Sequence, residues 1–121
     1  METTPETEVY QFNGREYVYD PSRRDETRAI PDITKAVPRE GFCVWVEYEN
    51  GEQGVADLED LLDDGLYFGW RNRRYFETVH PQGDLLTWGS GEIDIAPESV
   101  YMRVTGADLD EIWPIRFLDV P

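Results

Sequence analysis

The 121-residue chain carries 26 acidic and 11 basic residues, giving a formal net charge of −15. Hydrophobic residues make up 40% of it and aromatic residues 13%, which excludes a wholly disordered polymer and allows one domain with a buried core. No apolar run approaches the ~20 residues that a membrane-spanning helix needs. Cys43 is the only cysteine, so neither an internal disulfide nor a cysteine-rich zinc site can form. The acidic, polar start does not resemble a secretory signal, and we expect a soluble, cytoplasmic protein.

The acidic charge has two explanations. Lys35 is the only lysine, and acid-rich, lysine-poor chains are typical of proteins that work in concentrated salt, where self-repulsion is screened. Alternatively, an acidic surface imitates nucleic acid or binds a basic partner. The acidic residues are scattered, with one dense cluster at residues 57–64, which favours the halophile-like interpretation. Because no dense basic stripe exists, we do not expect direct nucleic-acid binding.

The N-terminal third predicts a flexible tail followed by a hairpin. Residues 1–8 are polar and resemble a frayed end. Val9–Phe12 and Arg15–Tyr19 flank an Asn-Gly pair, the strongest short hairpin signal. Residues 20–31 are polar and predict a loop or a short exposed helical turn.

The middle of the chain predicts a second sheet region. Residues 33–37 can form a short strand, and residues 42–48 alternate in a way typical of a central strand covered on both faces. Residues 53–56 pair back across a turn. Residues 57–64 predict a helix that Asp57 caps, with Gly65 in a left-handed cap after it.

The remainder predicts two more strands, a second helix and a last strand. Residues 75–79 and 85–88 read as strands joined by a turn. A glycine-rich turn and a short strand lead to a helix at 97–102, where Pro97 suits the first position and Glu98 faces the positive end of the helix dipole. Residues 112–118 can add a strand at a sheet edge, where proline is tolerated.

These elements predict an α+β fold, an antiparallel sheet of hairpins with two short helices at about 57–64 and 97–102. We expect one domain: a tail (1–8), an N-terminal hairpin extension and loop (9–30), a core (31–103), and a C-terminal tail or edge strand (104–121).

Several short motifs in a fixed order carry a family resemblance. They include Pro31-Asp32-Ile33, Tyr48-Glu49-Asn50-Gly51, Trp88-Gly89-Ser90-Gly91 and, most specifically, the run from Asp94 to Tyr101. From about residue 31 to residue 103 the chain resembles the bacterial family called domain of unknown function 2442. The residues that we treat as its structural signature are Asp57, Gly65, Trp88, Asp94, Pro97, Glu98 and Tyr101.

The resemblance implies a small α+β domain built on an antiparallel sheet. Some members of the family precede a DNA-binding helix-turn-helix domain, and many are encoded beside another small protein in arrangements that suggest toxin–antitoxin pairs. The family brings no catalytic residues. This chain differs by its N-terminal hairpin and by a short aromatic tail after Arg103, without room for a helix-turn-helix.

Candidate catalytic chemistry is sparse. His80 lies next to a proline in a predicted turn, and we interpret it as an exposed loop residue. Cys43 lies on a predicted strand, and we expect its thiol to be buried and unreactive. We interpret Asp94 as fixing the turn or capping the helix. We interpret Glu98 as a negative charge that interacts favourably with the positive end of the helix dipole. With one histidine and no calcium-loop spacing, we expect no metal, cofactor or catalytic site.

One aromatic and arginine-rich segment indicates an interface. Tyrosine, tryptophan and arginine dominate the energetics of protein–protein contacts. The candidate interface residues are Tyr67, Phe68, Trp70, Arg71, Arg73, Arg74 and Tyr75.

The first hypothesis is therefore a non-enzymatic protein–protein interaction module, the antitoxin-like half of a two-protein regulatory pair. Two alternatives remain: an acidic nucleic-acid mimic, and a hydrolase or metal enzyme that uses Asp94, Glu98 and His80. The sequence leaves the partner and the oligomeric state open.

Overall fold

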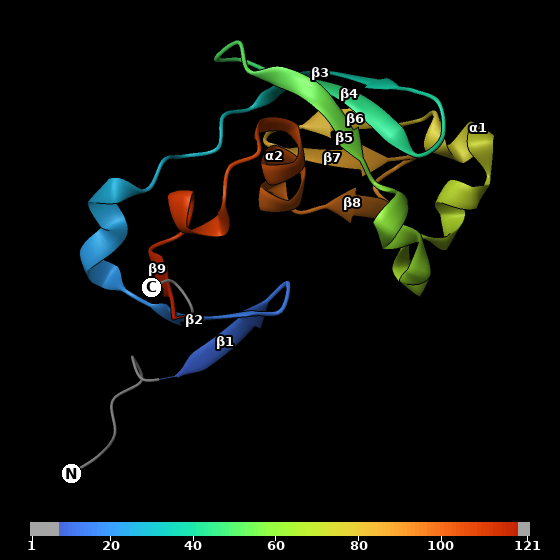
Figure 1. Cartoon of the computed structure of the whole chain (residues 1–121). Helices are drawn as coiled ribbons and strands as arrows, with labels where there is room; N and C mark the ends of the chain where they lie inside the picture. The colour runs from blue at the N-terminus through green and yellow to red at the C-terminus, as the bar shows by residue number, and fades with distance from the viewer. Residues whose placement is uncertain (1–7, 119–121) are drawn as a thin grey trace. The chain divides into compact units, whose positions relative to one another are not determined.

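The computed structural model describes residues 8–118 of the chain (Figure 1). The chain divides into two compact units: a terminal unit of residues 1–29 and 108–121, and a central unit of residues 30–107. Of the predicted flexible tail, residues 1–7 lie outside the described residues. The expectation of a single domain stays a prediction.

The terminal unit contains a small antiparallel sheet with the strand order β1-β2-β9. Asn13 and Gly14 have φ values of 51° and 79°, and this left-handed pair makes the tight turn that the sequence predicts. The C-terminal strand pairs with β2 at the sheet edge, which confirms the predicted edge strand. The elements of this unit are β1 (Val9–Phe12), β2 (Arg15–Tyr19), the 3₁₀ helices η2 (Pro21–Glu26) and η5 (Leu109–Glu111), and β9 (Ile115–Phe117).

The central unit holds two further antiparallel sheets. One has the order β3-β4-β5, with β3 at Ile33–Pro38, β4 at Cys43–Tyr48 and β5 at Gln53–Asp57. The other has the order β6-β7-β8, with β6 at His80–Gln82, β7 at Leu85–Trp88 and β8 at Ile93–Ile95. Along β4, buried residues alternate with half-buried ones, as predicted for a central strand. Residues 8–118 thus form three small antiparallel sheets, and with their short helices they confirm the α+β class.

The helix predicted at 97–102 is confirmed as α2 (Pro97–Thr105). Pro97 opens it and Glu98 lies in its first turn. The helix ends at Gly106, whose φ of 80° is the left-handed geometry that glycine adopts without steric cost. In Figure 1, α2 lies beside β5 and β7, which it contacts.

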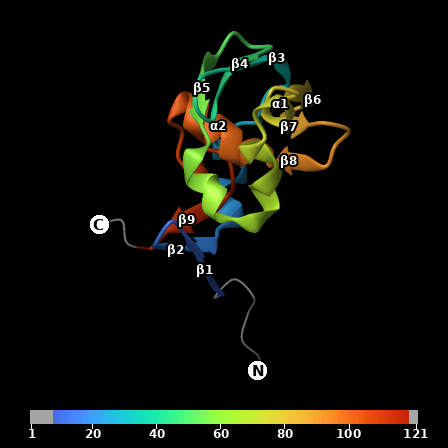
Figure 2. The same cartoon turned by 90° about the vertical axis from the view of Figure 1, so that its right-hand side faces the viewer.

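The chain between β5 and β6 differs from the prediction. The expected helix at 57–64 is a 3₁₀ helix, η3 (Glu59–Asp63), and a second one, η4 (Gly65–Arg71), follows it. Gly65 opens η4 and is absent from the described residues with positive φ, so the expected left-handed cap there is wrong. The predicted strand at 75–79 is also wrong, because α1 (Arg73–Phe76) occupies its first half. Figure 2 shows these helical turns facing the viewer.

The core of the central unit is built on large aromatic rings. Trp70, Phe76 and Trp88 are fully buried, and the two indole rings lie 4.8 Å apart. The indole N–H of Trp88 donates to the carbonyl of Phe76 at 3.0 Å, so this buried donor is satisfied. None of the helices within residues 8–118 has the length and apolar character to cross a membrane.

Candidate functional site

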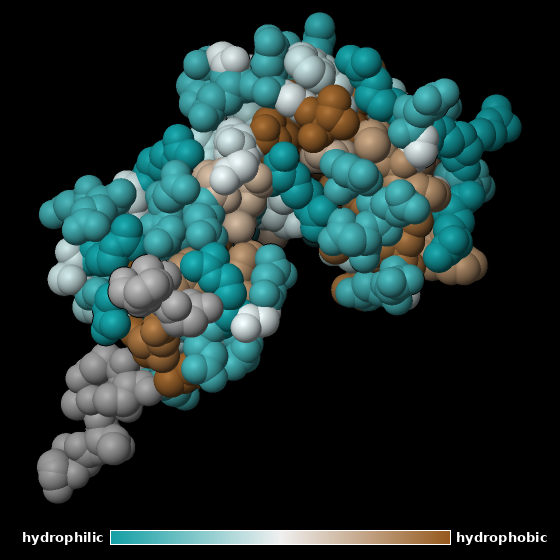
Figure 3. All heavy atoms as spheres, in the orientation of Figure 1, coloured by the Kyte–Doolittle hydropathy of each residue, from teal (hydrophilic) through white to brown (hydrophobic). Residues whose placement is uncertain are grey.

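The candidate interface segment forms η4 and α1, and it exposes two large apolar side chains. Leu66 is 74% exposed and Phe68 is 72% exposed. Each other large hydrophobic residue that is exposed within residues 8–118 has an exposed fraction below 50%. Figure 3 shows apolar atoms reaching the surface among hydrophilic ones in this region of the central unit. Leu66 is not among the interface residues that the sequence predicts, because the sequence predicts an α-helix at 57–64 where the structure has 3₁₀ helices.

Two side-chain caps explain why the segment folds in this way. The carboxylate of Asp64 accepts the backbone N–H of Leu66 at 2.9 Å and starts η4. The amide oxygen of Asn72 accepts the N–H groups of Arg74 and Tyr75 at 3.0 and 3.4 Å and starts α1. Such caps satisfy backbone donors that a helix start leaves unpaired.

Three of the predicted interface aromatics support the core. Trp70 is fully buried, so its expected place on the surface is wrong. Tyr67 is half-buried and stacks on Trp70, with ring centroids 4.6 Å apart. The hydroxyl of Tyr75 lies 3.0 Å from a carboxylate oxygen of Glu92 and 3.2 Å from the carbonyl of Trp88. Of the predicted aromatics, Phe68 alone projects freely from the surface.

The three predicted interface arginines have different surroundings. Arg73 donates to the carbonyls of Arg39 and Gly41 at 2.6 and 2.5 Å. Arg71 makes one long hydrogen bond, 3.4 Å, to the carbonyl of Leu62. Arg74 is exposed, and its side chain makes no hydrogen bond or ion pair with another residue in the described range. Only Arg73 therefore has a clear structural role.

A pocket opens beside this segment. It has a volume of about 490 Å³. One wall is the β3–β4 loop, from Pro38 to Phe42, and the other is the end of η4 and the start of α1, contributed by Trp70, Arg71 and Arg73. Volumes of roughly 300–1,000 Å³ are usual for small-molecule sites.

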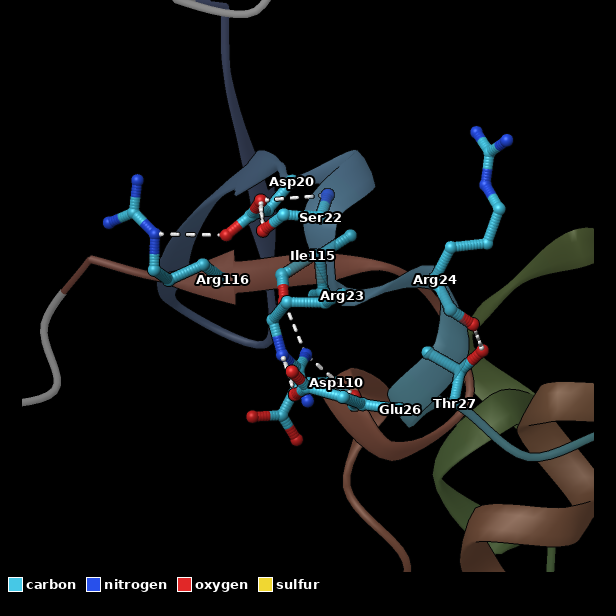
Figure 4. A network of polar contacts seen from close by, with 9 residues as sticks. All are labelled: Asp20, Ser22, Arg23, Arg24, Glu26, Thr27, Asp110, Ile115 and Arg116. Carbon is cyan, nitrogen blue, oxygen red and sulfur yellow. Dashed lines mark hydrogen bonds and ion pairs between the residues drawn. The ribbon is translucent and has the colours of Figure 1, made fainter.

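The arginines of η2, by contrast, are used within the terminal unit (Figure 4). Arg23 donates to the carbonyls of Asp110 and Ile115 at 2.9 and 2.6 Å and pairs with Glu26 at 3.1 Å. Arg24 hydrogen-bonds the hydroxyl of Tyr19. Of the two predicted alternatives, a loop or a short helical turn, residues 21–26 form the helical turn, and the side chains of Arg23 and Arg24 make structural contacts.

The residues of the enzyme hypothesis come from three separate elements. His80 and Asp94 lie on β6 and β8, each paired with Thr87 on the strand between them, so two strand spacings of about 4.8 Å separate their backbones. The ring of His80 instead contacts the carbonyl of Thr78 at 2.8 Å. Glu98 lies in the first turn of α2.

Asp94 does not cap α2, so the capping alternative for this residue is wrong. The cap residue of α2 is Ala96, which makes no side-chain cap, and Asp94 is an exposed residue within β8. Within residues 8–118, no group of three or more histidine, cysteine or acidic side chains is arranged to hold a metal ion.

The glycine-rich turn after β7 is a packed structural corner. A Cβ on Gly89 would lie 2.1 Å from Oε1 of Glu92 and 2.7 Å from a ring carbon of Tyr75. The same oxygen of Glu92 accepts the backbone N–H of Ser90 at 2.9 Å. This hydrogen bond is the largest cause of a lowered pKa of Glu92, and the hydrogen bond from Tyr75 is the second. Glycine at position 89 therefore allows the close approach that closes the turn.

The acidic stretch after β5 is anchored to α2. Asp57 accepts the N–H of Glu59 at 3.0 Å. The N-cap residue of η3 is Leu58, which makes no side-chain cap, so the predicted cap at Asp57 is wrong. Asp60 binds Arg103 through two contacts, at 2.6 and 3.1 Å. The hydrogen bond from Arg103 lowers the pKa of Asp60. These acidic residues thus have local structural functions.

Fold and surface together define a small protein of the antiparallel α+β class, with two exposed apolar side chains, Leu66 and Phe68, and an arginine-lined pocket. The family described as "Protein of unknown function (DUF2442)" matches residues 33–106, which is more than half of the chain. The chain belongs to this family, as the ordered motifs predict. Neither a curated protein nor a solved structure gives a significant match.

Proposed function

We propose that this protein is a non-enzymatic protein-binding module that docks through Leu66 and Phe68. The exposure of these two side chains, 74% and 72%, is the observation that carries the proposal. Large apolar side chains that project from a small domain are typical of interaction sites, and aromatic anchors dominate interface energetics. The backbone caps at Asp64 and Asn72 hold the segment in place before a partner arrives, which reduces the entropic cost of binding.

The partner that fits this surface has an apolar groove with a basic rim. Asp63 and Asp64 are exposed and lie just before Leu66, separated from it by Gly65, and the chain as a whole carries a charge of −15. Complementary charge steers association and fixes its register. Membership of this family agrees with a role as the antitoxin-like half of a two-protein regulatory pair. The product of the neighbouring gene is therefore the first partner to examine.

The test compares the affinity of matched variants for that purified partner. Burying a leucine or phenylalanine side chain contributes about 1.5–3 kcal/mol. The double variant L66S/F68S should therefore bind at least tenfold more weakly in calorimetric titration. Val55 is 47% exposed on β5, so V55S is a control that removes an apolar side chain elsewhere and should bind normally. Unchanged affinity of L66S/F68S would refute this docking surface.

A further inference from the structure

We propose that the pocket between the β3–β4 loop and η4–α1 binds a small oxyanion, a carboxylate or a phosphate, that is attached to an apolar group. This inference goes beyond the protein-binding role and does not depend on it. It rests on the charge of the lining, on unused hydrogen-bond donors, on an apolar wall and on a rigid frame.

The lining is basic in a strongly acidic chain. Arg39, Arg71 and Arg73 line the pocket, and Glu40 is the acidic residue among the lining side chains. The chain has 11 basic residues in total against 26 acidic ones. Gathering three arginines around one pocket creates a local positive site, and at about 0.1 M salt the distant acidic residues are screened beyond roughly 10 Å.

One of these arginines builds the frame. Arg73 donates to the carbonyls of Arg39 and Gly41 and pairs with Glu77 at 3.1 Å. It thereby ties α1 to the β3–β4 loop, which Gly41 turns with a φ of 65°. The N–H of Arg39 closes the same loop on the carbonyl of Cys43 at 2.8 Å. Both walls of the pocket are therefore fixed without a ligand.

The other two arginines keep donors for a ligand. The guanidinium of Arg39 lies 5.5 Å from the ring centre of Trp45 and makes no hydrogen bond or ion pair with residues 8–118. Arg71 makes the single 3.4 Å contact with Leu62. Each guanidinium offers five N–H donors in a planar fork that matches the geometry of carboxylate and phosphate. Two such groups on one pocket point to an oxyanion.

The apolar part of the lining favours a ligand whose oxyanion is attached to an apolar group. Pro38, Phe42 and Trp70 contribute to the same pocket. Trp70 is fully buried, and its indole N–H has no hydrogen-bond partner among residues 8–118.

The charge of the whole chain limits the size of the ligand. A polyanion such as nucleic acid would extend beyond the pocket into the field of a protein with a net charge of −15, and like charges repel. A small oxyanion that fits within about 490 Å³ avoids most of this repulsion. The ligand class is therefore a small apolar or aromatic acid or phosphate ester.

The experiment is a titration of the full chain followed by heteronuclear NMR, with the indole N–H of Trp70 as the reporter. The probes are benzoate, phenyl phosphate, inorganic phosphate and neutral benzyl alcohol. We expect benzoate or phenyl phosphate to shift the Trp70 resonance in a saturable way. The tighter of the two identifies the oxyanion as carboxylate or phosphate. Inorganic phosphate and benzyl alcohol should bind at least several-fold more weakly, because each lacks one half of the recognised group.

Matched arginine variants separate the pocket from a general charge effect. Loss of one charge-assisted contact should weaken binding of the better probe about tenfold in R71Q and in R39Q. R74Q makes the same charge change next to the pocket and should bind normally, since Arg74 is not among the lining residues. The dispersed NMR spectrum of each variant shows that it is folded. The absence of a saturable shift with every probe, or equal losses in R71Q and R74Q, would overturn the proposal.

Discussion

Tyr48 and Tyr101 pack edge to face, with ring centroids 5.2 Å apart and ring planes at 86°. Their hydroxyl groups differ in hydrogen bonding. The hydroxyl of Tyr101 donates to Glu52 at 2.6 Å, whereas that of Tyr48 is buried with no hydrogen-bond partner among residues 8–118. Burial, followed by the nearby hydroxyl of Tyr101 and the charge of Glu52, raises the pKa of Tyr48 far above its usual range. Tyr48 therefore remains neutral in the folded protein.

The pair predicts opposite results for one chemical change. Y48F removes a buried donor that lacks a partner, so the free energy of unfolding should stay the same or rise by up to about 1 kcal/mol. Y101F removes a satisfied hydroxyl and leaves Glu52 without that bond, which should cost about 1–2 kcal/mol. Urea unfolding of both variants measures the difference. A loss above about 1 kcal/mol in Y48F would mean that an ordered water satisfies the hydroxyl.

Gly89 should be the least replaceable glycine of the turn after β7. It has a φ of 64°, and a Cβ there would displace Glu92 and Tyr75. G89A should lose about 1–2 kcal/mol for the left-handed backbone and a similar amount for the displaced hydrogen bonds. Gly91 has a φ of 99° but open space around it, so G91A should carry only the backbone cost. Equal thermal destabilisation of the two variants would show that the contacts of Gly89 do not matter.

The sequence predicts those elements whose signals are local and strong. The Asn13-Gly14 turn, the alternation along β4 and the proline start of α2 all appear in the structure. Each of these signals depends on one or a few neighbouring residues. The turn depends on the positive φ that Asn-Gly adopts, β4 on burial that alternates every second residue, and the start of α2 on the fixed φ of proline.

Residues 57–79 were predicted less well, because tertiary contacts decide their conformation. Tyr75 and Phe76 favour strand by propensity, yet the cap at Asn72 and the burial of Phe76 against Trp70 place them in α1. Propensity is a weak prior that such packing overrides. The exposed Leu66 lies in the first turn of η4, a 3₁₀ helix that the spacing of the leucines does not predict. The pocket requires the β3–β4 loop and α1 to meet, so a linear pattern could not reveal it.

The ion pair between Asp60 and Arg103 predicts a pH dependence. The hydrogen bond from Arg103 lowers the pKa of Asp60 in the folded state, so its unfolded value, about 3.9, is the higher one. The contribution to stability is therefore complete above about pH 5 and is lost as the pH falls through the folded pKa. Because the side chain of Asp60 is 65% exposed, solvent screening limits the effect to about 0.5–1 kcal/mol.

The measurement is thermal unfolding of D60N and the unchanged protein from pH 7 to pH 2.5. The variant should be less stable at pH 7, and the gap should close on acidification. Glu59 is exposed and makes no ion pair with residues 8–118, so E59Q is the control for the loss of one negative charge. If E59Q lowers the stability as much as D60N, the pair with Arg103 contributes nothing specific.

The net charge of −15 predicts that salt stabilises the fold at neutral pH. Self-repulsion among the acidic residues destabilises the compact state, and raising the ionic strength from about 0.01 M to 1 M shortens the screening length from roughly 30 Å to 3 Å. We expect the midpoint of thermal unfolding to rise by roughly 4 °C or more with sodium chloride at pH 7, which corresponds to about 1 kcal/mol for a domain of this size. Near the sequence pI of 4.2 the net charge vanishes, so the same salt range should change the midpoint much less. A flat response at pH 7 would show that self-repulsion is already relieved within the fold. The acidic composition would then be explained by a binding surface rather than by a salt-rich environment.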